Sequence, residues 1–571
     1  MGVFFNGRLW VSPATMSVVD DSAMYNKNLS VGNLLAIVGK SEGGKPATAL
    51  RFGSASEARA VLRSGEALKA IELAFDPSAQ TYGPSTVVFV RVNPATQAAL
   101  TLLDGSAASV IDLVSEGYGL FTNGIKVKVE AGSVSGKKLT SQFGTSYYSD
   151  DNVKRNAFSV VYTGAEATAT ISISSASVTV QLGSATPVVI DLTAFGTISQ
   201  VVDRINAISP SLSAIVLDGN YEKATLNGLD YATAQSIKTT LFTVTANLQA
   251  VVDWFNSNGE GYVTATRKAN VGTVPANLAF TYLAAATDGE VTNVQWQAAF
   301  DALQTEDVQW VVPVSPTPAI HAMTDTHCSY MSNIARMERR CIVGGDINET
   351  DDFAIAAAKA LGSDRASYTH IGFYDYNTVG TLTLYPPYIL AGMLAGAFSG
   401  VNPGTALTNK TIKVRGLERK LRNPTDTDKL ILGGVLCVED TPKGFKVVKS
   451  ITTWLVNSNY NRVEISVGVA LDFVSRNVRN ILDDLRGMKG TPTALAMAVS
   501  RVDSTLAKLA EQEPMGPGVI VGDKLNPAYK NITASLEGDV MKVSFQCSPV
   551  IPINYIPVAI FAVPYSGSAS L

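Results

Sequence analysis

The segment Leu34-Leu-Ala-Ile-Val-Gly-Lys-Ser-Glu-Gly-Gly-Lys-Pro46 starts with a continuous apolar run and ends in a Gly/Pro turn. An apolar run without polar alternation is typical of a strand that is buried on both faces. The capping box Ser54-Ala-Ser-Glu57 predicts the start of a helix, and a second helix is predicted over Glu66–Phe75. Val87–Val92 is another apolar strand. A buried strand, helices and a second buried strand predict an α/β crossover.

The composition changes near residue 105, and Ser, Thr, Gly, Val and Ala are frequent from there to about residue 285. Lys126–Glu130 and Ala169–Val180 alternate polar and apolar residues, as strands with one buried face do. One helix is predicted inside this region, over Ser199–Ile208. We therefore interpret residues 106–288 as an inserted β-rich outer region, in which a second domain at about residues 157–240 is nested.

The α/β pattern resumes at about residue 289 and continues to residue 548. Strands are predicted at Trp310–Val314, Cys341–Gly344, Thr369–Tyr374, Leu430–Val438, Lys446–Thr453, Val463–Val469 and Val540–Cys547. Helices are predicted at Ala319–Met337, Asp352–Leu361, Ile389–Phe398, Leu471–Arg486 and Thr493–Gln512. The predicted fold class is α+β multidomain, with an α/β core split into residues 31–105 and 289–548, the inserted β-rich region, and extended terminal arms.

Both arms, residues 1–30 and 549–571, are apolar and extended. Their short apolar runs show no helical period, and prolines interrupt them at positions 13, 552, 557 and 564. Such arms bury too little of their own surface to fold alone, so they must lie on another surface. The residues leave open whether that surface belongs to the same chain or to a neighbouring one.

The composition excludes several classes of protein. Only 16% of the 571 residues are charged, whereas 46% are hydrophobic. Lys and Arg number 45 and Asp and Glu 49, so the net charge of −4 excludes a broad basic surface for nucleic acid. The longest apolar stretches, Tyr385–Val401 and the run from Val550, are broken by prolines or glycines and do not predict a membrane span. The apolar excess therefore belongs to a large core or to surfaces that meet other protein.

Motifs for catalysis or cofactor binding are missing from the sequence. Gly39-Lys40-Ser41 resembles the end of a phosphate-binding loop, but Leu34 stands where the first glycine is required. His321, His327 and Cys328 could offer zinc ligands from one helix, yet no fourth ligand is evident, and ordinary helical histidines are the better interpretation. The four cysteines are widely spaced and predict free thiols. We predict no enzyme, no cofactor and no metal, although residues distant in sequence could still meet in an active site.

Seven motifs follow one another along the chain: residues 35–46, Phe52-Gly-Ser-Ala-Ser-Glu-Ala58, Gly83-Pro-Ser-Thr-Val-Val-Phe-Val-Arg-Val92, Asn123-Gly-Ile-Lys-Val-Lys-Val-Glu130, Thr197–Asn206, Pro386-Pro-Tyr-Ile-Leu-Ala-Gly-Met393 and Val463-Glu-Ile-Ser-Val-Gly-Val-Ala-Leu-Asp-Phe-Val474. In this order they resemble the contractile tail sheath proteins of myovirus-type bacteriophages. At Gly468-Val469 the chain departs from that family, in which arginines are frequent at these positions.

The resemblance implies a structural subunit without a catalytic site. Such subunits form stacked hexameric rings around a tail tube and contract to drive the tube through the host envelope for genome delivery. The implied partners are further copies of the chain, the tail tube protein, and baseplate and tail terminator proteins, with no nucleic acid and no membrane insertion. The implied location is the virion, in the phage tail, after assembly in the host cytoplasm.

The resemblance also implies that both termini insert as strands into sheets of neighbouring subunits. The candidate strand-exchange residues are Leu9, Trp10, Val11, Met16, Val18, Val19, Tyr555, Ile556, Val558, Ile560, Phe561 and Val563. Because the C-terminal part faces the tube in this family, the candidate tube-facing residues are Arg479, Arg486, Lys489, Arg501 and Lys508. A solvated helix face explains these charges equally well. The alternative function is a non-phage structural or adhesive protein that binds a receptor through residues 111–285.

Overall fold

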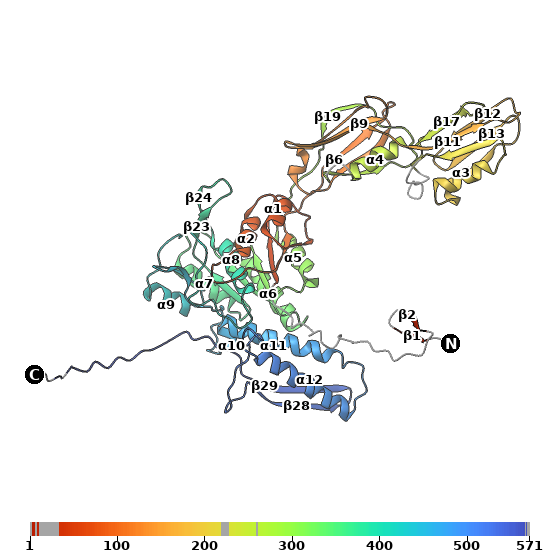
Figure 1. The fold of residues 1–571 in the computed structure, drawn as a ribbon. Helices are drawn as coiled ribbons and strands as arrows, with labels where there is room; N and C mark the ends of the chain where they lie inside the picture. The colour runs from red at the N-terminus through yellow and green to blue at the C-terminus, as the bar shows by residue number, and fades with distance from the viewer. Residues whose placement is uncertain are drawn as a thin grey trace, which may run out of the picture.

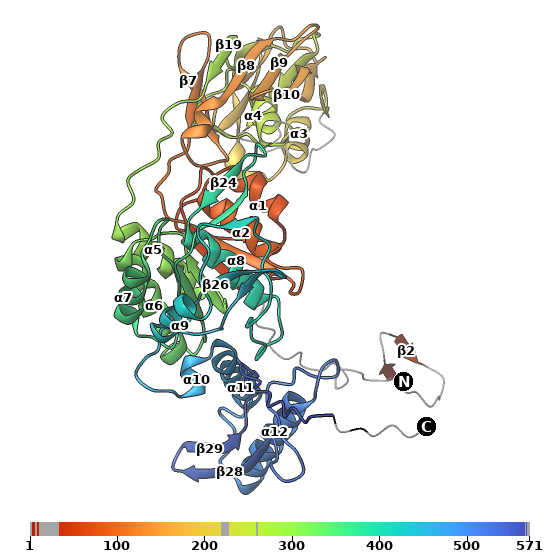
Figure 2. The same ribbon diagram turned by 90° about the vertical axis from the view of Figure 1, so that its left-hand side faces the viewer.

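The computed structural model describes residues 34–217, 228–257, 261–565 and 567, together with two short strands, Val3–Phe5 (β1) and Arg8–Trp10 (β2), which form an antiparallel pair. The described chain is elongated and has three parts (Figures 1 and 2). An α/β core lies in the middle, the β-rich insertion lies at one end, and a helical C-terminal unit lies at the other. The last described residues project away from the C-terminal unit (Figure 1).

A six-stranded sheet forms the centre of the core, in the order β22-β21-β20-β3-β5-β4. All neighbouring strands are parallel except β4, which is antiparallel to β5. The strands are β3 (Leu34–Gly39), β4 (Ala49–Phe52), β5 (Thr86–Arg91), β20 (Trp310–Pro313), β21 (Arg340–Gly344) and β22 (Ala366–Thr369). Because β3 pairs with β20, segments from before and after the insertion share one sheet, which confirms the split α/β core.

Helices cover both faces of this sheet. On one face, α2 (Glu66–Phe75) packs on β3 and against α8 (Pro387–Ser399), whose residues are all buried. On the other face lie α5 (Asn293–Ala302), α6 (Pro318–Asn333) and α7 (Asp351–Leu361). The Ser54 hydroxyl accepts from the Glu57 amide at the start of α1 (Ala55–Leu62), as the predicted capping box requires, but the Glu57 carboxylate accepts from the Gly53 amide and so does not complete the box.

Shorter elements complete the core. These are β23 (Phe373–Tyr376), β24 (Leu382–Tyr385), β25 (Gly416–Leu417), α9 (Thr425–Leu432), β26 (Val438–Thr441) and β27 (Gly444–Val447), with 3₁₀ turns at Leu120–Gly124, Leu192–Ala194 and Leu303–Thr305 elsewhere in the chain.

The insertion has two separate apolar cores, one for each of two units. The inner unit contains β6 (Ala99–Leu103), β7 (Ser109–Ser115), β8 (Ile125–Ala131), β9 (Lys137–Phe143), β10 (Ser146–Val153), α4 (Asn247–Ser257), β18 (Val263–Arg267) and β19 (Leu278–Tyr282). The outer unit contains β11 (Asn156–Tyr162), β12 (Ala169–Ile173), β13 (Ser177–Leu182), β14 (Val188–Asp191), α3 (Ile198–Asn206), β15 (Leu212–Val216), β16 (Ala232–Ser236) and β17 (Phe242–Thr245). The outer unit is nested, because strands and a helix of the inner unit flank it in sequence.

The C-terminal unit has its own apolar cluster. It consists of α10 (Tyr460–Val463), α11 (Ile465–Asp483), α12 (Pro492–Ala510) and the hairpin β28 (Tyr529–Glu537) and β29 (Val540–Cys547). Strand β29 has the predicted bounds. Along the described helices, none is both long and apolar enough to cross a membrane.

Four strand predictions are wrong or misplaced. Val463–Val469 belongs to α10 and α11, and Leu430–Val438 contains the end of α9 and a Gly433-Gly434 turn. Lys446–Thr453 overlaps β27 only as far as Val447, and Thr369–Tyr374 bridges the end of β22 and the start of β23. The first turns of α11 are buried on nearly all sides, so no polar face marks a helical period there.

Candidate assembly surfaces

Residues 551–565 of the C-terminal arm have no helix or strand and expose apolar side chains along their length. The exposed fractions are 76% for Tyr555, 78% for Ile556, 76% for Val558, 88% for Ile560, 86% for Phe561 and 83% for Val563. These are the C-terminal strand-exchange candidates. A contiguous exposed apolar segment of this size marks a surface that meets another molecule.

Of the N-terminal strand-exchange candidates, only Leu9 and Trp10 lie among the described residues. Leu9 and Trp10 lie in β2, where only the backbone is described. Val11, Met16, Val18 and Val19 lie outside the described residues.

A buried carboxylate holds the start of the C-terminal arm. Asn554 Nδ2 donates to Glu464 Oε1 at 2.7 Å, and Lys449 Nζ lies 3.6 Å from the same oxygen. The Glu464 side chain is 1% exposed, and its burial raises the pKa of the carboxyl group. Beyond this contact the arm leaves the surface, and the Lys449 ammonium lies over the ring of Tyr555.

The hairpin β28–β29 is a candidate acceptor for a strand. Ile532, Val543 and Phe545 pack from one of its faces onto the apolar cluster of the C-terminal unit. Among the described residues the two strands pair only with each other, so both outer edges of the hairpin carry unpaired backbone groups. An isolated two-stranded sheet is marginally stable, and an added strand supplies partners for these groups.

Two of the candidate tube-facing cations, Arg479 and Arg501, are half-buried and bind acceptors of their own chain. Arg479 Nη2 donates to Glu338 Oε2 at 2.5 Å. Arg501 Nη1 donates to the Ile481 carbonyl at 2.9 Å and lies 3.7 Å from Asp484. These partners orient both guanidinium groups within the chain.

The other three tube-facing candidates are exposed. Arg486 pairs with Asp483 at 2.6 Å at the end of α11, and Lys489 follows in the turn to α12. Both line a groove of about 550 Å³ whose apolar wall includes Met488 and Leu536. Lys508 lies further along α12. Arg486 and Lys489 thus line one groove, whereas Arg479, Arg501 and Lys508 do not line it.

Ion pairs join α11 to the edge of the core sheet, and the sequence analysis missed them. Asp472 of α11 accepts from Arg340 at 3.0 Å and from Arg365 at 2.7 Å. Arg476, one turn later, donates to Asp307 at 2.6 Å and to the Glu338 carbonyl at 2.9 Å. The one sign of these ion pairs in the sequence was Arg339-Arg340, two consecutive arginines directly before the strand predicted from Cys341.

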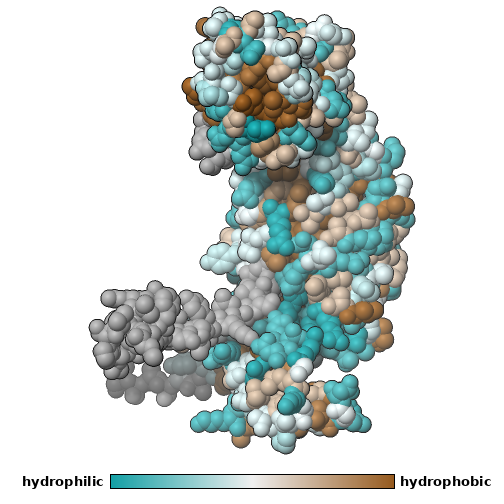
Figure 3. All heavy atoms as spheres, turned by 90° about the vertical axis from the view of Figure 1, so that its right-hand side faces the viewer, coloured by the Kyte–Doolittle hydropathy of each residue, from teal (hydrophilic) through white to brown (hydrophobic). Residues whose placement is uncertain are grey.

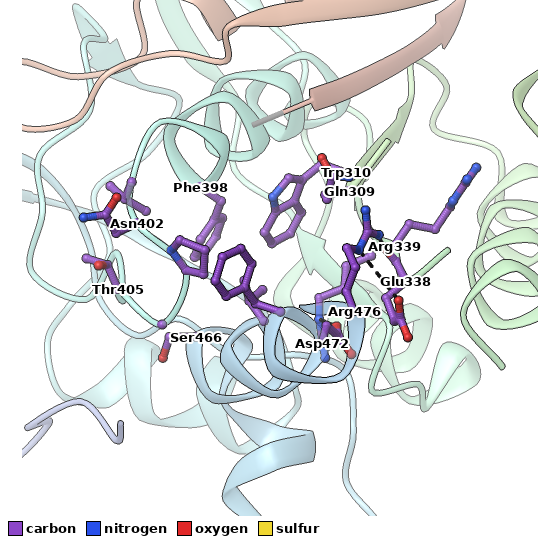
Figure 4. A pocket seen from close by; sticks show the side chains of 16 residues that line it. Gln309, Trp310, Glu338, Arg339, Phe398, Asn402, Thr405, Ser466, Asp472 and Arg476 are labelled. Atoms are coloured by element: carbon purple, nitrogen blue, oxygen red, sulfur yellow. Dashed lines mark hydrogen bonds and ion pairs between the residues drawn. The ribbon is translucent and has the colours of Figure 1, made fainter. Parts of the chain in front are cut away.

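These charges surround a cavity of about 40 Å³ between α11 and the core (Figure 4). Trp310 and Phe398 line it from the core, with stacked rings whose centroids are 4.9 Å apart. Asp472 and Arg476 line it from α11. The cavity is small and is bordered by paired charges, so it belongs to the joint between the two parts.

A second joint connects the core to the insertion. The Arg91 side chain is completely buried and donates to the Tyr118 carbonyl at 2.8 Å and to Asp288 at 2.9 Å. The Arg63 guanidinium lies over the Phe121 ring, 4.6 Å from its centroid. Both contacts fix the base of the insertion on the core.

The outer unit of the insertion also presents apolar surface (Figure 3). Val189, Ile215 and Leu241 are 62%, 59% and 61% exposed there.

The three histidines are bound within the chain. His327 Nε2 lies 3.0 Å from Arg339 Nη1, and burial together with this guanidinium lowers the pKa of His327 to about 4. His321 Nε2 lies 2.8 Å from the Ser315 carbonyl, and His370 Nε2 lies 3.1 Å from Asp351. Within the described ranges, no group of three or more His, Cys, Asp or Glu side chains is arranged to hold a metal ion.

The known proteins that are similar to this chain over nearly its whole length are tail sheath proteins. No protein-family model matches the chain. The tail sheath protein of Bacillus phage SP01 is 29% identical over an alignment of 590 positions, gaps included, which covers 99% of this chain and 98% of that protein. The tail sheath protein of Staphylococcus phage Twort is 23% identical, with 95% of each chain covered.

A solved structure shows the same fold. The crystal structure of a sheath tail protein from Listeria innocua matches with a TM-score of 0.56 at 14% identity and covers 93% of this chain and 94% of that one. The chain is thus similar to tail sheath proteins over nearly its whole length. This confirms the resemblance found in the sequence and the α+β multidomain fold class.

Proposed function

We propose that the chain is the structural subunit of a contractile phage tail sheath. It polymerises as stacked hexameric rings around a tail tube and contracts to drive the tube through the host envelope for genome delivery. The exposed apolar side chains from Ile556 to Val563 carry this proposal, because the described residues of the single chain leave them 76–88% exposed. The full-length similarity to tail sheath proteins supports it.

The arms join neighbouring subunits by strand addition. Backbone groups of a donated strand pair with the open edges of β28–β29, while alternating apolar side chains set the register. The strand-exchange residues are the twelve named from the sequence in both arms. Prolines 552, 557 and 564 fit at strand ends or edges, where a missing N–H group costs no ladder hydrogen bond.

Contraction is a change between two packings of rigid subunits. The ion pairs of α11 and the buried Arg91 hold the three parts of one subunit together, so the movement takes place between subunits. The arms act as tethers during this movement. Repeated heterologous contacts let one trigger spread along the helical array.

The partners follow from this role. They are further copies of the chain, the tail tube protein, and baseplate and tail terminator proteins. Arg486 and Lys489 are the best placed of the five tube-facing candidates, because both are exposed at one groove. The subunit has no enzymatic role and is located in the phage tail of the virion, after assembly in the host cytoplasm.

We also propose the domain division inferred from the sequence. It comprises an N-terminal arm at 1–30, core parts at 31–105 and 289–548, inserted domains at 106–288 with a nested domain at about 157–240, and a C-terminal arm at 549–571. The separate apolar cores of the two insertion units support this division.

Purified full-length chain tests the proposal by negative-stain microscopy and sedimentation velocity. We expect rings or tubes from the wild-type chain and monomers from a chain that ends at Asn554. A chain that lacks only residues 566–571 keeps the apolar run and is the matched control. A wild-type chain that stays monomeric at high concentration would refute the proposal.

A further inference from the structure

A polar pocket of about 300 Å³ lies where α10 and α11 meet the core. We call it the arginine pocket. Arg340 lines it from the start of β21, Arg365 from the turn before β22, and Arg462 from α10. The remaining lining residues are mostly polar as well, and they are Asn333, Asp364, Asn461, Gly468, Leu471 and Asp472. Guanidinium groups thus reach one pocket from three separate elements of the chain.

The charges that line the arginine pocket do not cancel. Asp472 Oδ2 accepts from Arg340 Nε at 3.0 Å and from Arg365 Nη1 at 2.7 Å, so one oxygen serves two cations. Asp364 Oδ2 accepts from Arg462 Nη1 at 3.2 Å, which is long for a charge-assisted hydrogen bond. With three arginines and two aspartates, the lining carries an excess of one positive charge.

The arginine pocket also has more donors than its own acceptors use. The Arg340 side chain is 6% exposed and donates from Nε to Asp472 and from Nη1 to the Asp364 carbonyl at 2.6 Å. Among the described residues no hydrogen bond uses Arg340 Nη2, which lies beside Gly468, where no side chain fills the space. The exposed amide of Asn461 adds donors at the rim. Unused donors on a buried cation favour a negatively charged acceptor.

Arg462 is held in place without a ligand. Its guanidinium group lies over the ring of Trp454, 4.6 Å from the centroid, and the contact with Asp364 fixes one end of the group. The side chain is still 42% exposed. Stacking and ion pairing therefore orient Arg462 in advance, and less conformational freedom is lost when a ligand binds.

A tetrahedral oxyanion of the phosphate class matches this arrangement best. Guanidinium groups bind both carboxylate and phosphate oxygens. A carboxylate offers two oxygens in one plane, whereas phosphate offers four in a tetrahedron, and the donors here come from β21, the turn before β22 and α10. The volume equals that of roughly ten water molecules at about 30 Å³ each, so the ion fits with part of its hydration shell.

We propose that the arginine pocket binds phosphate or a related tetrahedral oxyanion, with Arg340, Arg365 and Arg462 as donors. Arg340 and Arg365 belong to the core, whereas Arg462 belongs to the C-terminal unit. A bound oxyanion therefore links these two parts beside the ion pairs of Asp472 and stabilises their joint. Binding takes place in a single chain, so it is independent of assembly and goes beyond the proposed function.

Isothermal titration calorimetry of the full-length chain with sodium phosphate, at an ionic strength held constant with sodium chloride, tests the proposal. We expect saturable binding that sulfate competes with and that acetate matches only at concentrations at least about tenfold higher. Arg462→Gln and Asn461→Asp each lower the charge of the pocket by one and should weaken phosphate binding at least about tenfold. Both side chains are partly exposed, so both variants should fold. The matched control is Arg422→Gln, which makes the same change of charge in an exposed pair outside the pocket and should bind phosphate as the wild type does.

Thermal unfolding gives a second measurement. Saturating phosphate should raise the melting temperature of the wild-type chain and of Arg422→Gln more than that of Arg462→Gln. The comparison between variants is needed because phosphate salts also stabilise proteins by exclusion from their surface. The proposal is overturned if phosphate shows no saturable binding, if acetate binds as tightly, or if Arg462→Gln and Asn461→Asp keep the wild-type affinity.

Discussion

Replacing Ile556, Val558 and Ile560 together by alanine should abolish assembly and leave the subunit folded. The three side chains alternate along the arm and are 78%, 76% and 88% exposed in the single chain. Their truncation therefore removes almost no contact within the subunit. In an added strand they share one face. At about 0.8 kcal/mol for each buried carbon, the three changes cost about 6 kcal/mol per arm, roughly four powers of ten in the association equilibrium.

Sedimentation velocity over a range of concentrations measures this loss, and thermal unfolding of the monomer checks the fold. The control replaces Val189, Ile215 and Leu241 by alanine, because these residues are similarly exposed but lie on the outer unit of the insertion. We expect the control to assemble normally. Assembly of the arm variant at wild-type concentrations would show that the arm face is not buried between subunits. A clear fall in its melting temperature would show instead that the arm packs on its own chain.

Three further predictions concern the folded subunit. Asp472→Asn removes the counter-charge of two arginines and should lower the free energy of unfolding by about 3–5 kcal/mol in urea titrations, whereas Asp483→Asn in an exposed pair should change it little. Gly396→Ala places a Cβ 2.3 Å from a carbonyl oxygen of α2, so it should cost about 1–3 kcal/mol in thermal unfolding, and Gly105→Ala, with open space around it, should not. Burial and a neighbouring arginine lower the pKa of His327 to about 4, so on acidification the unfolded chain binds a proton at this histidine before the folded chain does. The contribution of neutral His327 to the free energy of unfolding should be fully present above about pH 6.5 and should be lost as the pH falls towards 4. Urea titrations at several pH values should show a smaller fall for His327→Gln.

The sequence predicts four of the six central strands, β3, β5, β20 and β21, because these are continuous apolar runs; β4 was not predicted and β22 was misplaced. Leu34–Val38 and Trp310–Val314 each lie between flanking turns, and both are buried on two sides in the structure. Their pairing could not be predicted from periodicity, since the partners are separated by the whole insertion. The return of the α/β pattern at about residue 289 predicted a split core, but it did not predict which strands pair across the insertion.

The strand prediction at Val463–Val469 failed for a physical reason. Alternating β-branched residues favour a strand when one face is polar and exposed. Here Glu464 and Ser466, the polar members of the pattern, are buried with the apolar ones, because α11 starts between the core and the C-terminal unit. The period of polar and apolar residues shows which face of an element is exposed, so a helix that is buried on all sides gives no helical period in the sequence.

At Gly468 the chain departs from the family pattern, and the structure shows a contact between α11 and the core at this position that the sequence does not reveal. A Cβ on Gly468 would lie 2.2 Å from Arg340 Nη2, so the missing side chain makes room for the guanidinium group. That group then reaches Asp472, one turn further along α11. A positive charge is therefore present beside this turn of the helix, and the core strand β21 supplies it. The glycine and the arginine are 128 residues apart, and neither is unusual in its own segment. Gly468 and Arg340 meet only because α11 packs on the core. The ion pairs therefore could not be predicted from local sequence, whereas the apolar strands could.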